Sequence, residues 1–353
     1  MSAAASIWEA VDRLLAGGDV PGIRAHKLGA AASRRLRRLG RPVPALLAHD
    51  DRVAAAEMLA APALLQRIRS VSEGPLVLIK GAEVARLYRD HARSFGDVDL
   101  LSPDPHRVQQ ALLESGFVEV DDSELFVDHH HLRPLQWPRL PLKVEIHSAP
   151  AWPDRFTPPP LAEILQAARP SLVGVDGISA PAPAHHALVL AAHHWTMEPL
   201  HTLRDLLDVA LVASAAGADE LEKTARAWGL HRIWHATYGA ADALLDGGRP
   251  TAALRLWARH LPALRERTVL DNHLLRWLRS FWELPPPAAL AATVHALRLE
   301  LLPEPGEPWR HKLKRVASAA RHPGAPLSTH TATWTEAVEA DDGSEPRRED
   351  APR

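Results

Sequence analysis

The sequence predicts an α+β fold, in which a small mixed β-sheet core with helices is flanked by N-terminal helices and a C-terminal helical domain. Three observations support this prediction. Helical periodicity dominates residues 1–73, short apolar runs alternate with helical patterns in residues 74–156, and helical periodicity returns in residues 157–321. Hydrophobic residues make up 46% of the 353-residue chain, so enough apolar side chains are available for a substantial core.

The N-terminal segment, residues 1–73, is predicted to be helical because apolar residues recur at helical spacing from Ile7 onward. A second helical pattern, rich in Ala, Leu and Met, covers residues 54–68 with one interruption at Pro62. The basic run at residues 34–41 is interpreted as the solvated face of a helix, since the formal net charge of the chain is only -2.

The core segment, residues 74–156, begins with the turn dipeptide Gly74-Pro75. Short apolar or alternating runs predict strands at residues 76–79, 98–101, 117–120 and 142–147. Two helices are predicted, at residues 81–90 and 106–115. The C-terminal helical domain, residues 157–321, is predicted to contain helices at residues 184–196, 200–215, 220–245 and 250–261 and further on. Residues 322–353 are expected to form a disordered tail.

Composition excludes several classes of function. The chain has no cysteine, which rules out disulfides, thiolate zinc sites and cysteine nucleophiles. It has neither a secretion-signal pattern at its start nor an apolar run of the ~20 residues that span a bilayer, so we expect a cytoplasmic protein without a membrane partner. The nearly neutral net charge disfavours a large polyanionic partner such as RNA.

Two aspartates form the first candidate site. In a strand alternate side chains share a face, so Asp97 and Asp99 point the same way and repel each other unless a cation lies between them. Mg²⁺ prefers such carboxylate oxygens. The strand at residues 142–147 places Glu145 and His147 on one face, and if it lies beside the aspartates, Glu145 supplies a third carboxylate for metal ions. By itself, the motif also fits two exposed aspartates at a loop edge.

A possible phosphate site precedes the aspartates. Lys80 and Gly81 stand where a strand is expected to turn into a helix, and glycine there lets the backbone approach a phosphate. Lys80 adds charge to the same site, and Arg93 is a second cation for phosphate contact.

Histidines and a helical pair offer further candidates. Adjacent histidines in a strand point to opposite faces, so the run at residues 129–131 does not easily bind one zinc ion. His130 and His131 are instead expected to line the acceptor pocket or to pack in the fold. His147 shares a face with Glu145, so it either orients that carboxylate through a hydrogen bond or is a core or turn histidine. Arg204 and Asp208 are one helical turn apart, so they either pair with each other or face a cleft.

These motifs together resemble the bacterial uncharacterised nucleotidyltransferase family of the DNA polymerase β-like nucleotidyltransferase superfamily. The resemblance covers about residues 76–208, and the matching segments are Lys80-Gly81, Tyr88, Arg93, residues 97–101, residues 130–135, residues 144–147, His193-His194 and residues 203–208. The broader superfamily usually has serine after the glycine, whereas this chain has Ala82 and therefore lacks one hydroxyl contact to phosphate.

The resemblance implies a nucleotidyltransferase core that transfers a nucleoside monophosphate from an NTP, with ATP expected, to an acceptor hydroxyl. It implies Mg²⁺ or Mn²⁺ as cofactor, with Asp97, Asp99 and Glu145 as catalytic residues and metal ligands, and Lys80, Gly81 and Arg93 as nucleotide-binding residues. The acceptor is unidentified, and a small molecule, peptide or protein is favoured over RNA. The alternative is a catalytically silent nucleotide-binding or adaptor protein built on the same fold.

Overall fold

The computed structural model describes residues 3–120, 132–303 and 307–328. Its contacts group the chain into two compact units. The first unit comprises Met1–Thr251 and Leu261–Arg265, and the second comprises Ala252–His260 and Glu266–Arg353. The boundaries predicted after residues 73 and 156 both fall inside the first unit. They divide that unit into smaller segments and stay a prediction.

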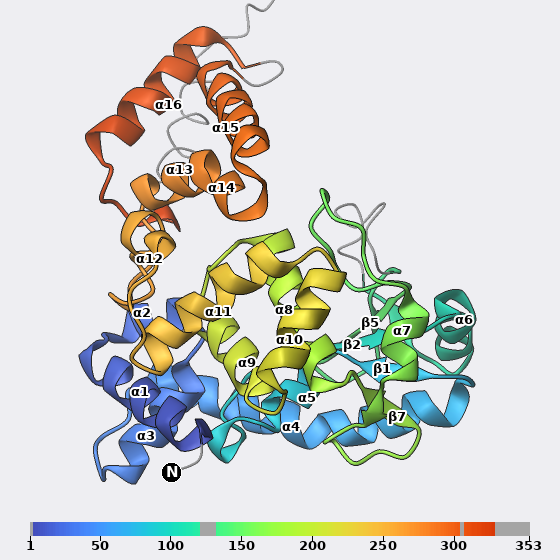
Figure 1. The fold of residues 1–353 in the computed structure, drawn as a ribbon. Coiled ribbons are helices and arrows are strands. Elements are labelled where there is room, and N and C mark those ends of the chain that lie inside the picture. The colour runs from blue at the N-terminus through green and yellow to red at the C-terminus, as the bar shows by residue number, and fades with distance from the viewer. Residues whose placement is uncertain (1–2, 121–131, 304–306, 329–353) are drawn as a thin grey trace, which may run out of the picture. The chain divides into compact units, whose positions relative to one another are not determined.

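The first unit contains a mixed sheet, which lies on the side of α6 (Pro105–Glu114) and α7 (Leu161–Gln166) (Figure 1). In the described part of the chain its order is β3-β4-β5-β2-β1-β7-β6. The strands are β1 (Leu76–Leu78), β2 (Asp97–Leu101), β3 (Val118–Glu119), β4 (Leu135–Gln136), β5 (Lys143–His147), β6 (Arg169–Pro170) and β7 (Ile178–Ala180). Strand β2 runs parallel to β5 and antiparallel to β1, while β1 runs parallel to β7. The α+β fold with a small mixed sheet is therefore confirmed.

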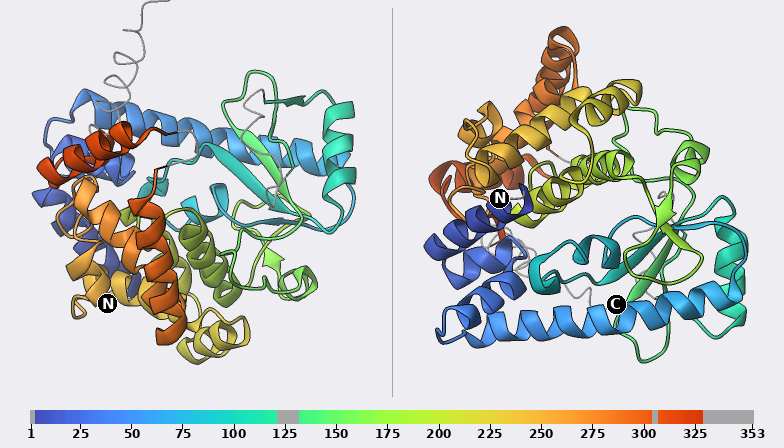
Figure 2. Two further views of the ribbon diagram at one scale, coloured as in Figure 1. Left: turned by 90° about the horizontal axis from the view of Figure 1, so that it is seen from above. Right: turned by 60° about the horizontal axis from the view of Figure 1, so that its bottom comes forward.

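One face of the sheet packs on two helices, α4 (Ala45–Val71) and α6 (Pro105–Glu114). Helix α4 runs beneath the sheet (Figure 2), and its Leu64, Leu65 and Ile68 are buried against the apolar side chains of β1, β2 and β5. Pro62, which interrupts the helical pattern of the sequence, does not end the helix, because this 27-residue helix continues through the proline. The burial of one long apolar stripe outweighs the local cost of that residue.

The first unit contains further helical elements. They are α1 (Ala3–Gly17), α2 (Val20–Ala25), α3 (Gly29–Arg38), α5 (Ala82–Ala85), the 3₁₀ turn η1 (Arg89–His91), α7 (Leu161–Gln166), α8 (Pro183–Met197), α9 (Leu203–Ala213), α10 (Ala218–Ala227) and α11 (His231–Leu245). The single helix predicted at residues 220–245 is two helices, because Gly229 takes the left-handed conformation (φ 68°) between α10 and α11.

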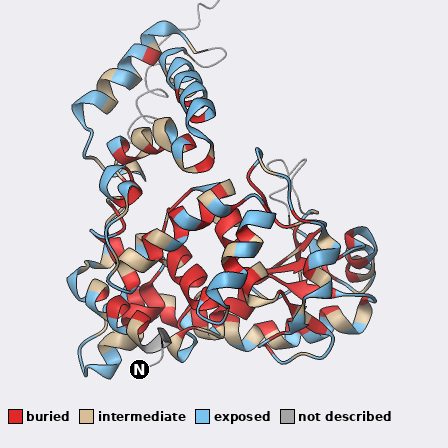
Figure 3. Cartoon of the chain, viewed as in Figure 1, coloured by how far each residue is buried: buried red, intermediate tan, exposed pale blue. Residues whose placement is uncertain are grey.

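The second unit is helical in the residues that the structure describes. It contains α12 (Ala252–Leu256), α13 (Val269–Leu278), α14 (Ser280–Glu283), α15 (Pro286–Leu301) and α16 (Trp309–Arg321). Figure 3 shows that α15 and α16 are mostly exposed, whereas buried residues concentrate in the sheet and in α8 and α9. Leu327 donates a backbone hydrogen bond to Arg267, so ordered structure continues past residue 322. No helix among the described residues is long and apolar enough to cross a membrane.

Candidate active site

The pairing of β2 with β5 brings the predicted carboxylates together. In the parallel register Asp99 lies opposite Glu145, and Leu101 lies opposite His147. The intervening Val98 and Val144 belong to the core against α4 and α6, so the alternation of side chains sends Asp99, Glu145 and His147 to the other face. The condition set by the sequence, that these two strands are neighbours, is therefore met.

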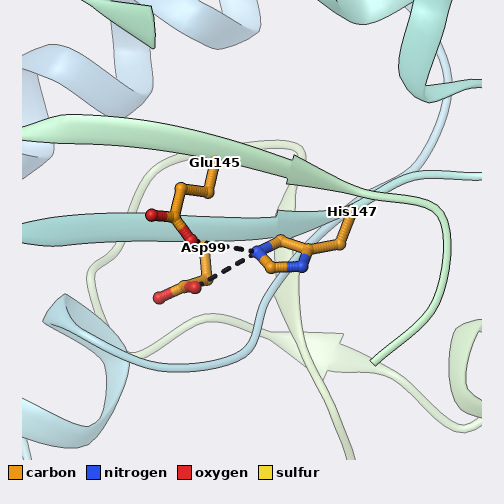
Figure 4. Close-up of side chains that lie close together, drawn as sticks. All are labelled: Asp99, Glu145 and His147. Atoms are coloured by element: carbon orange, nitrogen blue, oxygen red, sulfur yellow. Dashed lines mark hydrogen bonds and ion pairs between the residues drawn. The ribbon is translucent and has the colours of Figure 1, made fainter. Parts of the chain in front are cut away.

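Three side chains form a compact cluster on this face (Figure 4). His147 Nε2 lies 3.2 Å from Asp99 Oδ1 and 3.7 Å from Glu145 Oε2. One possible ligand atom from each residue lies within 4.8 Å of the other two. His147 thus contacts both carboxylates rather than Glu145 alone. Asp97, at the start of β2, is not a member of this three-residue cluster and lines the adjoining cleft.

Lys80 lies against the same carboxylates. Its Nζ is 2.9 Å from Asp99 Oδ1 and 3.3 Å from His193 Nε2 of α8. Burial would lower the pKa of Lys80, but the charges of Asp99 and Asp97 raise it. Burial would likewise raise the pKa of Asp99, but Lys80 and His147 hold it well below its usual range. Asp99 and Lys80 therefore form a buried ion pair.

At the other two carboxylates, burial and like charge outweigh the nearby cations. Burial, and then the charge of Asp99, raises the pKa of Asp97. Burial and the charges of Asp99 and Asp97 raise the pKa of Glu145 to about 7. In addition, the buried Asp99 Oδ2 has no hydrogen-bond partner among the described residues. A cation bound here would relieve this repulsion and be coordinated by the unpaired oxygen. The carboxylates therefore fit a divalent metal ion.

Gly81 stands where the chain leaves β1 and passes close to β2. Its φ is 54°, and an added Cβ would lie 2.6 Å from the carbonyl oxygen of Asp97. The close approach therefore requires glycine. The helix that follows is much shorter than the predicted residues 81–90, since α5 ends at Ala85. Tertiary contacts redirect the chain here, because the carboxylate of Glu83 accepts hydrogen bonds from Ser171 and Leu172.

Arg93 is held in a buried ion pair. Its Nε and Nη2 donate to the two carboxylate oxygens of Asp208 over 2.8 and 2.7 Å, and the hydroxyl of Tyr88 donates to the same carboxylate over 2.6 Å. Arg93 Nη1 also donates to the carbonyl of Gly81. Arg204 and Asp208 were expected either to pair within the helix or to face a cleft. In the described contacts Asp208 pairs with Arg93, and both Arg204 and Asp208 line the cleft described below.

A cleft of about 650 Å³ opens beside these groups. The cleft is lined by Asp97 of β2, by Lys80 and Gly81 in the turn after β1, and by residues of α8 and α9. The other lining residues are Lys27, Arg93, Phe95, Gly96, Leu190, His193, His194, Met197, Glu198, His201, Arg204, Asp205 and Asp208. The cleft is large enough for one cofactor-sized ligand.

Sequence reasoning located part of this site. His130 and His131 lie outside the described residues. The roles of Asp208 as the partner of Arg93 and of Lys27 as a cleft residue were not found, because neither follows from local spacing. His193, Arg204 and Asp208 all lie in the helical segments that contributed to the family resemblance. That resemblance was the signal in the sequence that could have placed them near the site.

Comparisons with known proteins bear on this arrangement. No curated protein and no solved structure is similar enough to the chain to count as a match. A family described as "Uncharacterised nucleotidyltransferase" matches residues 21–246. That range contains β2, β5, the carboxylate cluster and the residues that line the cleft, all of them in the first unit. Because the match covers more than half of its length, the chain belongs to the uncharacterised nucleotidyltransferase family.

Proposed function

We propose that this protein transfers a nucleoside monophosphate from an NTP to an acceptor hydroxyl. Membership of a nucleotidyltransferase family supports nucleotidyl transfer in general. The finer proposal rests on one observation, the cluster of Asp99, Glu145 and His147 beside Lys80 and next to a large cleft. Carboxylates beside a cation at a cleft suit a reaction whose catalysis depends on positioning and on stabilising phosphate charge.

The proposed metal ligands are Asp97, Asp99 and Glu145, with His147 close enough to join them or to orient them. A bound Mg²⁺ or Mn²⁺ ion would supply charge to the α-phosphate and activate the acceptor oxygen. Asp99 is held in place by Lys80 and His147, so its orientation is set before a ligand binds. Glu145, with a pKa raised to about 7, would ligate a second metal ion or accept the acceptor's proton.

We assign the nucleotide's phosphates to the side of the cleft near Gly81. Gly81 lines the cleft there, and the ammonium of Lys80 lies between Asp99 and His193, from where it would balance phosphate charge. Arg93 lines the same cleft, but its guanidinium is bound to Asp208 and to the Gly81 carbonyl. Its proposed contribution is therefore to hold the Gly81 turn and to add positive charge to the wall.

The test is pyrophosphate release from each of the four NTPs with Mg²⁺, followed by mass spectrometry of acceptors in a lysate. We expect Asp97→Asn to lower turnover at least about a hundredfold. Because the pKa of Asp97 is raised, its negative charge is unfavourable in the folded state, so the same change should hold or raise the free energy of unfolding. The exposed Asp176→Asn is the matched control. Retained turnover in Asp97→Asn would contradict the assignment.

A catalytically silent nucleotide-binding protein is the second candidate. It is favoured by Ala82 after the glycine, which removes a hydroxyl from the phosphate side, and by the tight pairing of Lys80 with Asp99. Isothermal titration with Mg²⁺ and each NTP separates the two functions. Saturable binding of an NTP without pyrophosphate release under any acceptor mixture would favour the silent protein.

A further inference from the structure

Two cations from distant parts of the chain meet at the edge of the cleft. Lys27 lies in the turn between α2 and α3, and Arg204 lies in the first turn of α9. The backbone N–H of Leu203 donates to His26 Nδ1 over 3.1 Å, which fastens the α2–α3 turn to the start of α9. This contact places the charge of Lys27 beside that of Arg204, whose repulsion helps to lower the pKa of Lys27 after the larger effect of burial.

The pair stands where two cavities join. The second cavity has a volume of about 600 Å³, and it shares Lys27, Phe95, Gly96 and Arg204 with the cleft described above. Beyond them it extends toward α3 and α4, away from the residues assigned to the metal ion and the nucleotide. At Gly96 an added Cβ would meet nothing within 4 Å, so the passage at this residue is open.

The charges of this pair are poorly compensated within the described structure. The ammonium of Lys27 makes no hydrogen bond or ion pair with a described residue, although the charges of Asp205 and Asp97 act on it from a distance. Arg204 donates to the carbonyl of Ser94 and lies 3.8 Å from Asp205, but its buried Nε has no hydrogen-bond partner among the described residues. By contrast, Arg24 of the second cavity is paired with Asp50 at 2.9 Å. Lys27 and Arg204 are therefore available to an anion.

The backbone at Lys27 is also unusual. Its φ is 56°, in the left-handed region, directly after the C-cap of α2, where glycine is the favoured residue. A lysine held in this conformation costs about 1 kcal/mol relative to glycine. The chain thus has a lysine at a position where the backbone conformation alone would favour glycine.

We propose that Lys27 and Arg204 bind an oxyanion of the acceptor, a phosphate or a carboxylate group, and so align the acceptor's hydroxyl with the carboxylate site. This inference rests on the proposed function and names the chemical class of its second substrate. The first cavity alone has the volume of a ligand site, so the second leaves room for another molecule. A guanidinium fork and an ammonium together match the geometry and charge of an oxyanion.

The experiment is calorimetric titration of the full chain with inorganic phosphate and, separately, with succinate at constant ionic strength. Each titration is run with Mg²⁺ and saturating α,β-methylene-ATP, and again without nucleotide. The variants are Lys27→Gly and Arg204→Ala, with the exposed Lys223→Ala as the matched loss of charge. Lys27→Gly is informative because it removes the ammonium and relieves the backbone strain, so it should not lower the melting temperature.

We expect the original chain to bind at least one of the two anions, and Lys223→Ala to bind it with the same affinity as the original chain. The presence of the nucleotide analogue should not change either affinity. Lys27→Gly and Arg204→Ala should each weaken that binding about tenfold. Preference for one of the two anions identifies the acceptor's group. Absence of saturable binding, or unchanged binding in both variants, would overturn the proposal.

Displacement of the anion by the analogue would also overturn it, because the cation pair would then belong to the triphosphate. Failure of the analogue to bind would count against ATP as the nucleotide of the proposed function. The titrations without nucleotide would still decide whether Lys27 and Arg204 form an oxyanion site, so the two failures can be told apart.

Discussion

The ion pair of Arg93 and Asp208 joins the sheet region to α9 at the floor of the cleft. Both side chains are buried, and Tyr88 completes the hydrogen bonds of the carboxylate. Burial would raise the pKa of Asp208, but the Arg93 guanidinium holds it below its usual value. Arg93 was expected to contact phosphate. This geometry indicates that it also stabilises the fold, and its contribution to stability can be measured separately from phosphate binding.

Loss of Arg93 should be costly for folding. We expect Arg93→Met to lower the free energy of unfolding by about 3–5 kcal/mol, because it leaves the Asp208 charge buried without its partner. The double change Arg93→Met with Asp208→Leu should recover most of that loss. Urea unfolding measures both, and Arg107→Met at the exposed pair with Glu73 is the control, with an expected cost below about 1 kcal/mol. Unchanged stability in Arg93→Met would leave phosphate binding as its main role.

His186 of α8 is the buried contact between that helix and the end of β1. Its Nε2 lies 2.7 Å from the carbonyl oxygen of Ile79, to which it must donate, directly before Lys80. Burial lowers its pKa from 6.5 to about 4. The histidine is therefore neutral in the folded protein at neutral pH.

This residue should make stability depend on pH. As the pH falls below 6.5, His186 becomes protonated in the unfolded chain, whereas in the folded chain it stays neutral until about pH 4. The free energy of unfolding therefore falls across that window, by about 3 kcal/mol in all. His186→Gln keeps a donor for Ile79 and removes the titration, so its profile from pH 6.5 to 4 should be flatter. Urea unfolding at several pH values measures this, with exposed His231→Gln as the control. Identical slopes for all three proteins would refute it.

At the scale of elements, α4 shows tertiary packing overriding local preference. Pro62 lies inside the helix, while the buried Leu64, Leu65 and Ile68 continue its apolar stripe beneath the sheet. Its missing N–H and its ring penalise the helix interior, and the packed stripe offsets that cost.

Replacement of this proline should stabilise the protein. We expect Pro62→Ala to raise the free energy of unfolding by about 1–3 kcal/mol, because a helix hydrogen bond is restored. The control is Pro183→Ala in the first turn of α8, where proline is well tolerated and no gain is expected. Denaturant unfolding of both variants decides the matter. Equal effects at the two positions would show that the interior proline carries no particular penalty.

At the scale of the whole molecule, the candidate site lies within one compact unit. The residues of the carboxylate cluster and of both cavities belong to the first unit, as does the whole family match at residues 21–246. The second unit is formed by the described helices from α12 to α16. Ligand binding should therefore stabilise the two units unequally.

Calorimetry of the full chain tests this expectation. We expect two unfolding transitions, and Mg²⁺ with α,β-methylene-ATP at about a hundred times its dissociation constant should stabilise one of them by about 2.7 kcal/mol. The other transition should stay unchanged, and Asp97→Asn should show a smaller shift. A single transition would mean that the two units unfold as one, and an equal shift of two transitions would contradict the placement of the ligand in the first unit alone.

Much of the candidate site was predictable because it depends on local patterns. Alternation in β2 and β5 identifies the face that carries Asp99 and Glu145, and Gly81 marks the turn. The short strands β4, β6 and β7 were missed because each contains or adjoins a proline, at positions 134, 170 and 181, and proline argues against a strand. Lys80 was expected at a phosphate, and only the structure reveals its contact with Asp99.

The sequence by itself determined which side chains share a strand face, where the chain needs glycine, and which family its motifs resemble, because each of these follows from neighbours in the chain. The tertiary structure alone decided that Arg93 pairs with Asp208, 115 residues away, and that Lys27 stands beside Arg204. The physical reason is that such partners are selected by the packing of whole helices against the sheet, which local periodicity does not encode.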